Sequence, residues 1–152
     1  MDTKNTPIAI GSDHAGYYLK ESLIEDLRAD GYQIQDFGTF SLESVDYPDI
    51  AREVAEAISS GRFERGILVC GTGIGISIAA NKVKGIRATV CSDTFSARMS
   101  REHNNANIIA VGARVVGAGL ALDIVKSFLE TPFEYGSRHE RRVDKINALD
   151  EC

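Results

Sequence analysis

A short apolar run leads directly into a glycine-rich turn in the stretch Gly66-Ile67-Leu68-Val69-Cys70-Gly71-Thr72-Gly73-Ile74-Gly75. The first five residues predict a strand, and the next five predict a turn. A helical run over residues 76–82 follows the turn. The stretch therefore predicts a strand, a turn and a helix in succession, which is the repeating unit of an α/β fold.

The same alternation of short apolar runs and longer amphipathic segments extends toward both ends of the chain. The expected strands are residues 8–10, 32–37, 66–70, 86–91 and 108–111, and the expected helices are residues 19–27, 50–58, 76–82, 93–101, 120–129 and 137–149. This rhythm predicts an α/β fold, a three-layer Rossmann-like sandwich with a five-stranded parallel sheet. The 152 residues show no internal repeat and no linker, so we expect one domain over residues 1–152.

The composition excludes several classes of protein. Hydrophobic residues make up 43% of the chain and charged residues 26%, which is typical of a globular protein rather than a disordered one. The 17 basic and 22 acidic side chains leave a net charge of -5. Because the whole molecule repels phosphate backbones, we expect no nucleic-acid partner, and any anion site must be local.

The cysteines and the apolar stretches argue against secretion and membrane insertion. Cys70, Cys91 and Cys152 form no Cys-x-x-Cys pair, which favours a reducing compartment over a disulfide framework or a zinc site. The first seven residues lack the basic and apolar regions of a signal peptide. The longest uncharged stretch, residues 66–81, is too short to span a bilayer and contains four glycines. The default expectation is a cytoplasmic protein without a membrane partner.

Polar residues follow four of the five predicted strands. In an open parallel sheet, ligands bind at the carboxyl ends of the strands, near a switch in strand order. The loops at that edge contain residues 11–16, 70–75, 92–93 and 112–114. We therefore expect these loops to build the site.

The glycine-rich turn is the strongest feature of these loops. Gly71, Gly73 and Gly75 let the backbone approach a ligand and point amide groups at negative charge, which favours an oxyanion or a phosphate. The alternative is a tight strand-to-helix connection without a ligand. The glycine spacing matches the dinucleotide fingerprint only in part, although Asp93 lies near the position of a ribose-binding acid. Ile76 stands where a P-loop has lysine.

Cys70 and the histidines each have a chemical and a structural explanation. Amide groups beside Cys70 can lower the pKa of its thiol and expose a thiolate as base or nucleophile, whereas the alternative is a small buried apolar side chain. His14, His103 and His139 lie beside polar or cationic residues. Each is equally well explained as a solvated side chain, and their spacing does not indicate a metal site.

Arg138 and Arg142 stand four residues apart in the last predicted helix. They share one face, so their two guanidinium groups can grip a phosphate. From the residues alone, the favoured alternative is a solvated face that pairs with Glu134 or Glu140.

Blocks of sequence along nearly the whole chain match a known family. They are Asp13–Gly16, Asp46–Pro48, Gly66–Lys82, Gly85–Ala88, Arg101–Asn104, Gly112–Gly117 and Arg138–His139. In this order the blocks resemble the type B ribose-5-phosphate isomerases. The resemblance is far more specific than the glycine-rich turn alone.

The resemblance implies an aldose-ketose isomerase that interconverts D-ribose 5-phosphate and D-ribulose 5-phosphate through an enediolate, in the non-oxidative pentose phosphate pathway. It implies no cofactor and no metal. It also implies a homodimer or a dimer of dimers with active sites shared between subunits, and a C-terminal helix, residues 138–150, that packs at the interface. Relatives of this family act on six-carbon sugar phosphates, so an isomerase of allose 6-phosphate is the alternative. Cys70 and Thr72 favour a ribose enzyme over a galactose one.

The resemblance assigns the proton transfers to named residues. Cys70 is implied to move a proton between C1 and C2, and Asp13 to move a hydroxyl proton. Thr72 and His103 are implied to assist opening of the furanose ring. A subset of the family uses a glutamate as base on the next helix, but residues 77–80 here read Ser-Ile-Ala-Ala, which favours Cys70.

The resemblance also implies the substrate-binding residues. These are Tyr47 and Asn104 for the sugar, Gly71, Gly73, Ile74 and Gly75 for the oxyanion, and His14, Arg114, Arg138 and Arg142 for the phosphate, with His139 nearby. It implies that His103, Asn104 and Arg114 come from the neighbouring subunit. From other classes of protein, a non-catalytic sugar-phosphate or nucleotide-binding module and a dinucleotide oxidoreductase remain as alternatives.

Overall fold

The computed structural model describes residues 3–151 and contains a five-stranded, fully parallel sheet. The strands are β1 (Ile8–Ser12), β2 (Ile34–Asp36), β3 (Arg65–Cys70), β4 (Ala88–Val90) and β5 (Ile108–Gly112). The helices are α1 (Tyr17–Ala29), α2 (Tyr47–Ser59), α3 (Ile74–Ala80), α4 (Thr94–Glu102), α5 (Ala118–Glu130) and α6 (Arg138–Ala148), with 3-10 turns at Thr3–Asn5 and Leu149–Glu151. The predicted α/β fold is confirmed.

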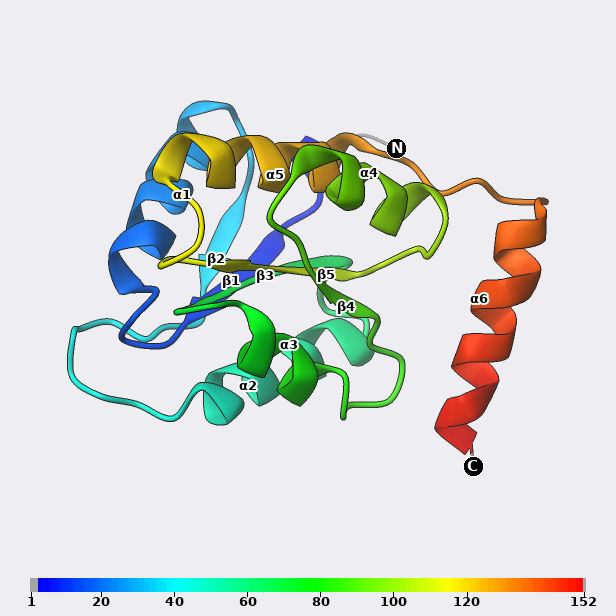
Figure 1. Ribbon diagram of the computed structural model, residues 1–152, viewed down its shortest axis with the longest axis horizontal. Coiled ribbons are helices and arrows are strands. Elements are labelled where there is room, and N and C mark those ends of the chain that lie inside the picture. The colour runs from blue at the N-terminus through cyan, green and yellow to red at the C-terminus, as the bar shows by residue number, and fades with distance from the viewer. Residues whose placement is uncertain (1–2, 152) are drawn as a thin grey trace.

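The sheet separates two apolar cores (Figure 1). Helices α1, α4 and α5 cover one face, and α2 and α3 cover the other. Successive side chains of a strand point to opposite faces. In β3, Ile67 and Val69 belong to the core beneath α1, α4 and α5, whereas Leu68 and Cys70 belong to the core beneath α2 and α3.

The strand order β2-β1-β3-β5-β4 contains a switch point between β1 and β3. From β1 the chain enters α1 on one face of the sheet, and from β3 it enters α3 on the opposite face. Open α/β sheets bind ligands at the carboxyl ends of strands at such a point. The loops after β1 and β3 are therefore the place to look for a site, as the sequence predicts.

Two strands are shorter than expected because turns next to them use the backbone groups. The N–H of Ile86 donates to the carbonyl of Val83 in a turn, so β4 starts two residues later than predicted. The N–H of Tyr32 donates to the carbonyl of Leu27 and closes the end of α1, so β2 does not include this residue.

Helix α6 lies beyond the amino edge of the sheet, outside both layers (Figure 1). Within α6, His139 and Val143 are buried, while Ile146 and the following Leu149 are 43% and 68% exposed. An exposed apolar stripe of this kind is what an interface helix needs, and the expectation that it packs on another subunit stays a prediction. No helix within residues 3–151 has the length and apolar character needed to cross a bilayer.

Candidate active site

The turn after β3 curls back onto the side chain of Cys70. Cys70 is 5% exposed, and its Sγ accepts a hydrogen bond of 3.1 Å from the N–H of Gly73. Gly73 has φ +78°, and a Cβ there would lie 2.9 Å from the carbonyl carbon of Val111. A glycine is therefore required both for the backbone angle and for the close approach to β5. The sulfur is held beside a backbone donor, which stabilises negative charge on it.

Backbone contacts join this turn to the end of β5. The N–H of Arg114 donates to the carbonyl of Gly71 at 2.9 Å, and a Cβ on Gly112 would lie 2.6 Å from the backbone of Thr72. Thr72 itself is exposed, and its Oγ1 accepts a hydrogen bond of 3.2 Å from the N–H of Ile74. The hydroxyl of Thr72 is thus fixed at the surface of the turn, next to Cys70.

Arg114 lies beside the turn of its own chain. Its guanidinium Nη1 is 3.0 Å from the position that a Cβ on Gly71 would take. The family resemblance implies that Arg114, like His103 and Asn104, reaches the site from a neighbouring subunit. The structure instead places this cation with Gly71 of the same chain, because β5 and β3 are neighbours in the sheet.

The loop after β1 brings a carboxylate and an imidazole to the same edge. The N–H of Asp13 donates to the carbonyl of Val69, the residue before Cys70, and the carboxylate accepts a hydrogen bond from the N–H of Gly16. Asp13 is 6% exposed. His14 Nδ1 accepts a hydrogen bond from the N–H of Val45, so the proton of a neutral ring is on Nε2.

Tyr47, the first residue of α2, packs on the glycine-rich turn from the other side. Its hydroxyl oxygen is 2.8 Å from the position that a Cβ on Gly75 would take. Any side chain at Gly75 would displace the ring, which is 39% exposed. Pro48 follows in the first turn of α2, where its missing N–H removes no intrahelical hydrogen bond. It therefore favours a helix that starts at Tyr47.

The structure brings together six of the predicted side chains in this way. We call them the carboxyl-edge cluster, which consists of Asp13, His14, Tyr47, Cys70, Thr72 and Arg114. They come from four separate loops, yet backbone hydrogen bonds or close glycine contacts hold each loop that carries them. A buried carboxylate, a thiol with an amide donor and exposed hydroxyl and guanidinium groups suit proton transfer on an anionic substrate.

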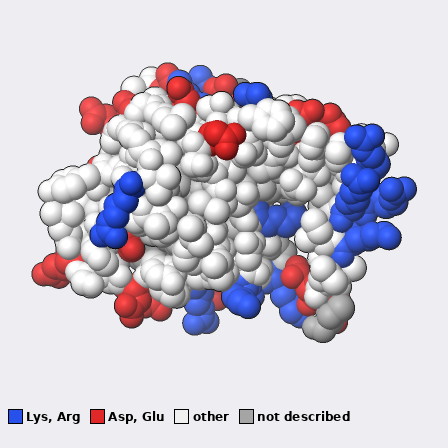
Figure 2. Space-filling model, in the orientation of Figure 1, with Lys and Arg blue, Asp and Glu red and all other residues white. Residues whose placement is uncertain are grey.

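The remaining predicted side chains lie at the opposite edge of the sheet. Helix α4 begins after the carboxyl end of β4 and ends before the amino end of β5, with His103 as its C-cap. Helix α5 likewise begins after the carboxyl end of β5, and the chain then continues to α6. Lys and Arg side chains gather at this end of the molecule (Figure 2). We call this set the amino-edge cluster, which consists of His103, Asn104, Arg138, His139 and Arg142.

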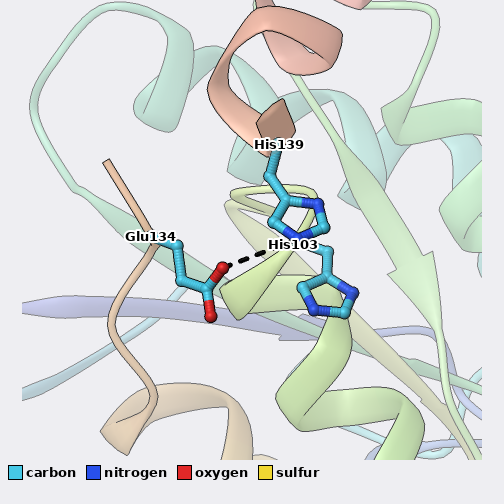
Figure 3. Close-up of side chains that lie close together, drawn as sticks. All are labelled: His103, Glu134 and His139. Atoms are coloured by element: carbon cyan, nitrogen blue, oxygen red, sulfur yellow. Dashed lines mark ion pairs between the residues drawn. The ribbon is translucent and has the colours of Figure 1, made fainter. Parts of the chain in front are cut away.

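Two imidazole rings stack at the centre of the amino-edge cluster (Figure 3). The rings of His103 and His139 are 4.0 Å apart and inclined by 9°, and His139 Nε2 lies 3.5 Å from Glu134 Oε2. Burial lowers the pKa of His139, as do the charges of His103 and the two arginines, while Glu134 opposes the shift. His139 is therefore uncharged at neutral pH.

Glu134 and Glu140 contact groups other than the two arginines. Glu134 lies 3.5 Å from His139, and Glu140 accepts a hydrogen bond of 2.6 Å from the N–H of Gly136. Arg138 and Arg142 are both exposed, and neither takes part in the ion pairs found within residues 3–151. The two arginines thus form a solvated face without an ion pair to Glu134 or Glu140, and their grip on a phosphate stays a prediction.

His103, Glu134 and His139 are also the described residues nearest to a metal-ligand set. One ligand atom of each lies within 4.8 Å of the others. Metal–imidazole bonds of about 2.0–2.1 Å lie in the plane of the ring, however. Because the two rings are parallel and stacked, their nitrogen lone pairs run side by side and do not converge. The arrangement suits stacking better than coordination.

Comparison with known proteins covers both clusters. A family model described as Ribose/Galactose Isomerase matches residues 8–146. The chain belongs to this family. Its members include ribose-5-phosphate isomerase B of Clostridium thermocellum, whose solved structure matches with a TM-score of 0.93 and 58% identity, over 95% of this chain and 97% of that one. The resemblance stated from the sequence is thereby confirmed.

Other members of the ribose/galactose isomerase family match along nearly their whole length. Ribose-5-phosphate isomerase B of Escherichia coli is 49% identical over 144 residues, which cover 95% of this chain and 96% of that protein. D-erythrulose-4-phosphate isomerase of Pectobacterium atrosepticum is 46% identical over 140 residues, 91% of each chain. The relatives thus bear the names of phosphorylated sugars of different lengths.

Lys20 belongs to none of the motifs in the sequence, yet it has a structural role at the carboxyl edge of the sheet. Its side chain is fully buried, and its Nζ lies 2.7 Å and 2.8 Å from the carboxylate oxygens of Asp36. Asp36 also accepts a hydrogen bond from the N–H of Gly38, whose carbonyl accepts one from the N–H of Ser12. Lys20 thereby fixes the segment after β2 against the residue that precedes Asp13. Its position next to Leu19 on the apolar face of α1 is the one indication in the sequence.

Proposed function

We propose that the chain interconverts D-ribose 5-phosphate and D-ribulose 5-phosphate by proton transfer through an enediolate, without a metal or cofactor. The observation that carries this proposal is the Sγ of Cys70 held against the N–H of Gly73, with the buried Asp13 joined through its N–H to the carbonyl of Val69, the residue before Cys70. The family membership and the names of the full-length relatives support the same reaction.

The thiolate of Cys70 removes the proton from C2 of the open-chain aldose. The C2–H electrons form the C1=C2 double bond, and the carbonyl oxygen on C1 takes the negative charge. Asp13 moves the hydroxyl proton from O2 to O1, and Cys70 returns its proton to C1, which leaves the carbonyl at C2. Each bond that is broken is matched by one that forms, so no oxidant or reductant is needed.

The glycine-rich turn stabilises the oxyanion of this intermediate. Its backbone donors lie beside Cys70, and two of them, from Gly73 and Ile74, already point at the sulfur and at Thr72 Oγ1. A developing oxyanion next to the sulfur takes hydrogen bonds from the same turn. The missing side chains of Gly71 and Gly75 let Arg114 and Tyr47 lie directly against the turn, so a substrate at this turn meets both side chains.

The two clusters meet only when two copies of the chain associate. We infer a homodimer, or a dimer of dimers, in which the amino-edge cluster of one copy completes the carboxyl-edge cluster of another. Large apolar side chains beside the carboxyl edge are exposed, as expected for a face that a partner covers. They are Ile74, Ile78, Val90, Phe95 and Val115, between 40% and 62% exposed.

In this assembly each substrate contacts both copies. His103 of the second copy works with Thr72 in ring opening, and Asn104 holds the sugar together with Tyr47. The phosphate is held by four side chains with His139 stacked nearby; the four are His14, Arg114, Arg138 and Arg142. We infer that the protein acts in the non-oxidative pentose phosphate pathway, in the cytoplasm.

The test follows ribulose 5-phosphate formation from ribose 5-phosphate without added metal. Cys70→Ala is expected to lower kcat by about 10²–10⁴-fold, the usual contribution of a general base, while substrate binding is kept. Cys91→Ala is the matched control, since Cys91 is equally buried but lies in the opposite core. Full turnover in Cys70→Ala contradicts the role of the thiol. Faster turnover of allose 6-phosphate by the native chain contradicts the five-carbon assignment.

A further inference from the structure

Three arginines converge on a pocket that the proposed reaction does not use. The pocket has a volume of about 440 Å³ and opens at the amino edge of the sheet. Arg65 comes from the start of β3, Arg87 from the segment before β4 and Arg101 from the last turn of α4. The polar side chains of Glu64, Asn105, Asn107 and Tyr135 line it with them, beside the apolar Ile58 and Phe63.

Arg101 is a buried cation with neutral partners. It is 2% exposed, and its guanidinium donates to the carbonyls of Thr131 and Ala106 and to the side-chain oxygen of Asn105. Burial lowers the pKa of Arg101 to about 9, and the charges of Arg65 and Arg87 contribute to this shift. Fully buried charges in proteins are normally paired with an opposite charge, which Arg101 lacks here.

The other two arginines also lack an acidic ion-pair partner among the described residues. Arg87 donates to the carbonyl of Asn105 and to the side chain of Asn147. The Nε of Arg65 is buried and has no hydrogen-bond partner within the described chain. None of the three arginines takes part in an ion pair between residues of the described range 3–151.

Two acidic side chains act on this group: Glu64 lines the pocket itself, and Asp150 acts on Arg87. The charge of Glu64 raises the pKa of Arg65 and Arg101, and that of Asp150 raises the pKa of Arg87. In both cases burial has the larger and opposite effect. Three cations against two carboxylates leave a local excess of positive charge in a chain whose net charge is -5.

We propose that this pocket is a second oxyanion site, which binds a phosphate group independently of the active site. Guanidinium groups form paired hydrogen bonds with phosphate oxygens, and the free Nε–H of Arg65 supplies a donor that has no other use. The exposed hydroxyl of Tyr135 adds an uncharged donor, whereas the amide of Asn107 already donates to the carbonyl of Gly85. The volume is sufficient for a phosphate with a small attached group.

The site lies next to residues of the amino-edge cluster. Arg101 stands two residues before His103 in the chain, and Asn105 follows two residues after it. A phosphate held by Arg65, Arg87 and Arg101 would tie the end of α4 to the starts of β3 and β4. Binding there is therefore expected to raise the thermal stability of the chain through mass action.

Calorimetric titration with inorganic phosphate tests the site in the Arg138→Ala/Arg142→Ala background, which lacks two arginines of the active-site phosphate grip. We expect one phosphate per chain to bind in this background and to raise the melting temperature. Adding Arg65→Gln should weaken this binding at least about tenfold. Adding Arg62→Gln is the matched control, because this substitution removes the same charge from an exposed side chain three residues away.

Arg65→Gln in the otherwise native chain should keep its isomerase kcat, which shows that the variant folds. Ribose 5-phosphate, titrated in the same background, distinguishes the source of the phosphate group. Tighter binding than inorganic phosphate indicates a site for substrate or product, and weaker binding indicates a site for free phosphate. The proposal is overturned if neither ligand binds at millimolar concentration, or if Arg65→Gln and Arg62→Gln weaken binding equally.

Discussion

The two edges of the sheet carry the two halves of the predicted site in different ways. At the carboxyl edge, backbone hydrogen bonds join the loops after β1, β3 and β5, and Gly73, Gly75 and Gly112 let them touch. At the amino edge, the side chains sit on the end of α4 and on α6, which lies outside both layers (Figure 1). Cys70 and Asp13 thus lie in loops that backbone contacts interlock, whereas Arg138 and Arg142 lie on a helix outside both layers.

This difference indicates which changes act on folding and which act on catalysis. A substitution at a glycine where these loops touch removes contacts that hold the fold, so its main effect is on stability, whereas a substitution of Cys70 acts on the proposed proton transfer. A substitution on α6 removes an exposed charge, so its main effect is on substrate affinity. The predictions below test this division, beginning with the largest effect.

Lys20→Met is expected to destabilise the chain by about 3–5 kcal/mol, because it leaves the carboxylate of Asp36 without its buried partner. Chemical denaturation measures the change. The double variant Lys20→Met/Asp36→Asn is the control, and it should recover part of the loss because no unpaired charge remains. A double variant that is no more stable than Lys20→Met would contradict the importance of the pair.

Gly73→Ala is expected to cost about 2–4 kcal/mol, the sum of backbone strain and overpacking against Val111. Gly85→Ala separates the two causes, because Gly85 also has a positive φ of +84° but a Cβ there meets nothing within 4 Å. Thermal unfolding of both variants should show a clearly smaller loss for Gly85→Ala. Equal losses would mean that the packing of the turn on β5 contributes nothing.

Arg138→Ala is expected to raise the KM for ribose 5-phosphate by about 10–100-fold with little change in kcat, since it removes a charged hydrogen bond to the phosphate. Arg141→Ala is the control from the same helix, because it deletes an equal charge that the phosphate grip does not include. Steady-state kinetics of the two variants decide the matter. An identical rise in KM would show that only the total charge of α6 counts.

The smallest effect concerns the pH dependence of stability. The pKa of His139 is lowered in the folded chain, so the unfolded chain binds more protons as the pH falls through the ordinary histidine range. The folded state is therefore expected to lose stability from about pH 6.5 downward, the unperturbed value for histidine. The free energy of unfolding from pH 7.5 to 5 should fall less in His139→Gln. A parallel fall in both proteins would assign the effect to other groups.

The strands, the helices and the loops at the carboxyl edge could be predicted from local pattern, whereas Tyr47 entered the predicted site only through the family resemblance, which also implied that Arg114 comes from a neighbouring subunit. Apolar runs mark the strands, and parallel strands bring the loops that contain Asp13, Cys70 and Arg114 to one edge. The burial of Lys20 could not be predicted, because its partner Asp36 is 16 residues away and belongs to another element.

The residue pattern also did not predict that the proposed site residues form two clusters at opposite edges of the sheet. Cys70 and His103 both belong to motif blocks of the family, but α4 carries His103 from one edge of the sheet to the other. Only the placement of the helix shows that the two cannot meet within one chain. The pocket of Arg65, Arg87 and Arg101 could not be predicted either, because these residues are far apart in the sequence and converge from three parts of the fold.

The most direct test of the shared site uses dimers that contain two different chains, purified through two affinity tags. A dimer of a Cys70→Ala chain and a His103→Ala chain keeps one intact site if the clusters pair between copies, so it should show about half of the native activity. A dimer of a native chain and a Cys70→Ala/His103→Ala chain should then be almost inactive. The reverse outcome, an inactive first dimer and a half-active second one, would show that each chain builds its site alone.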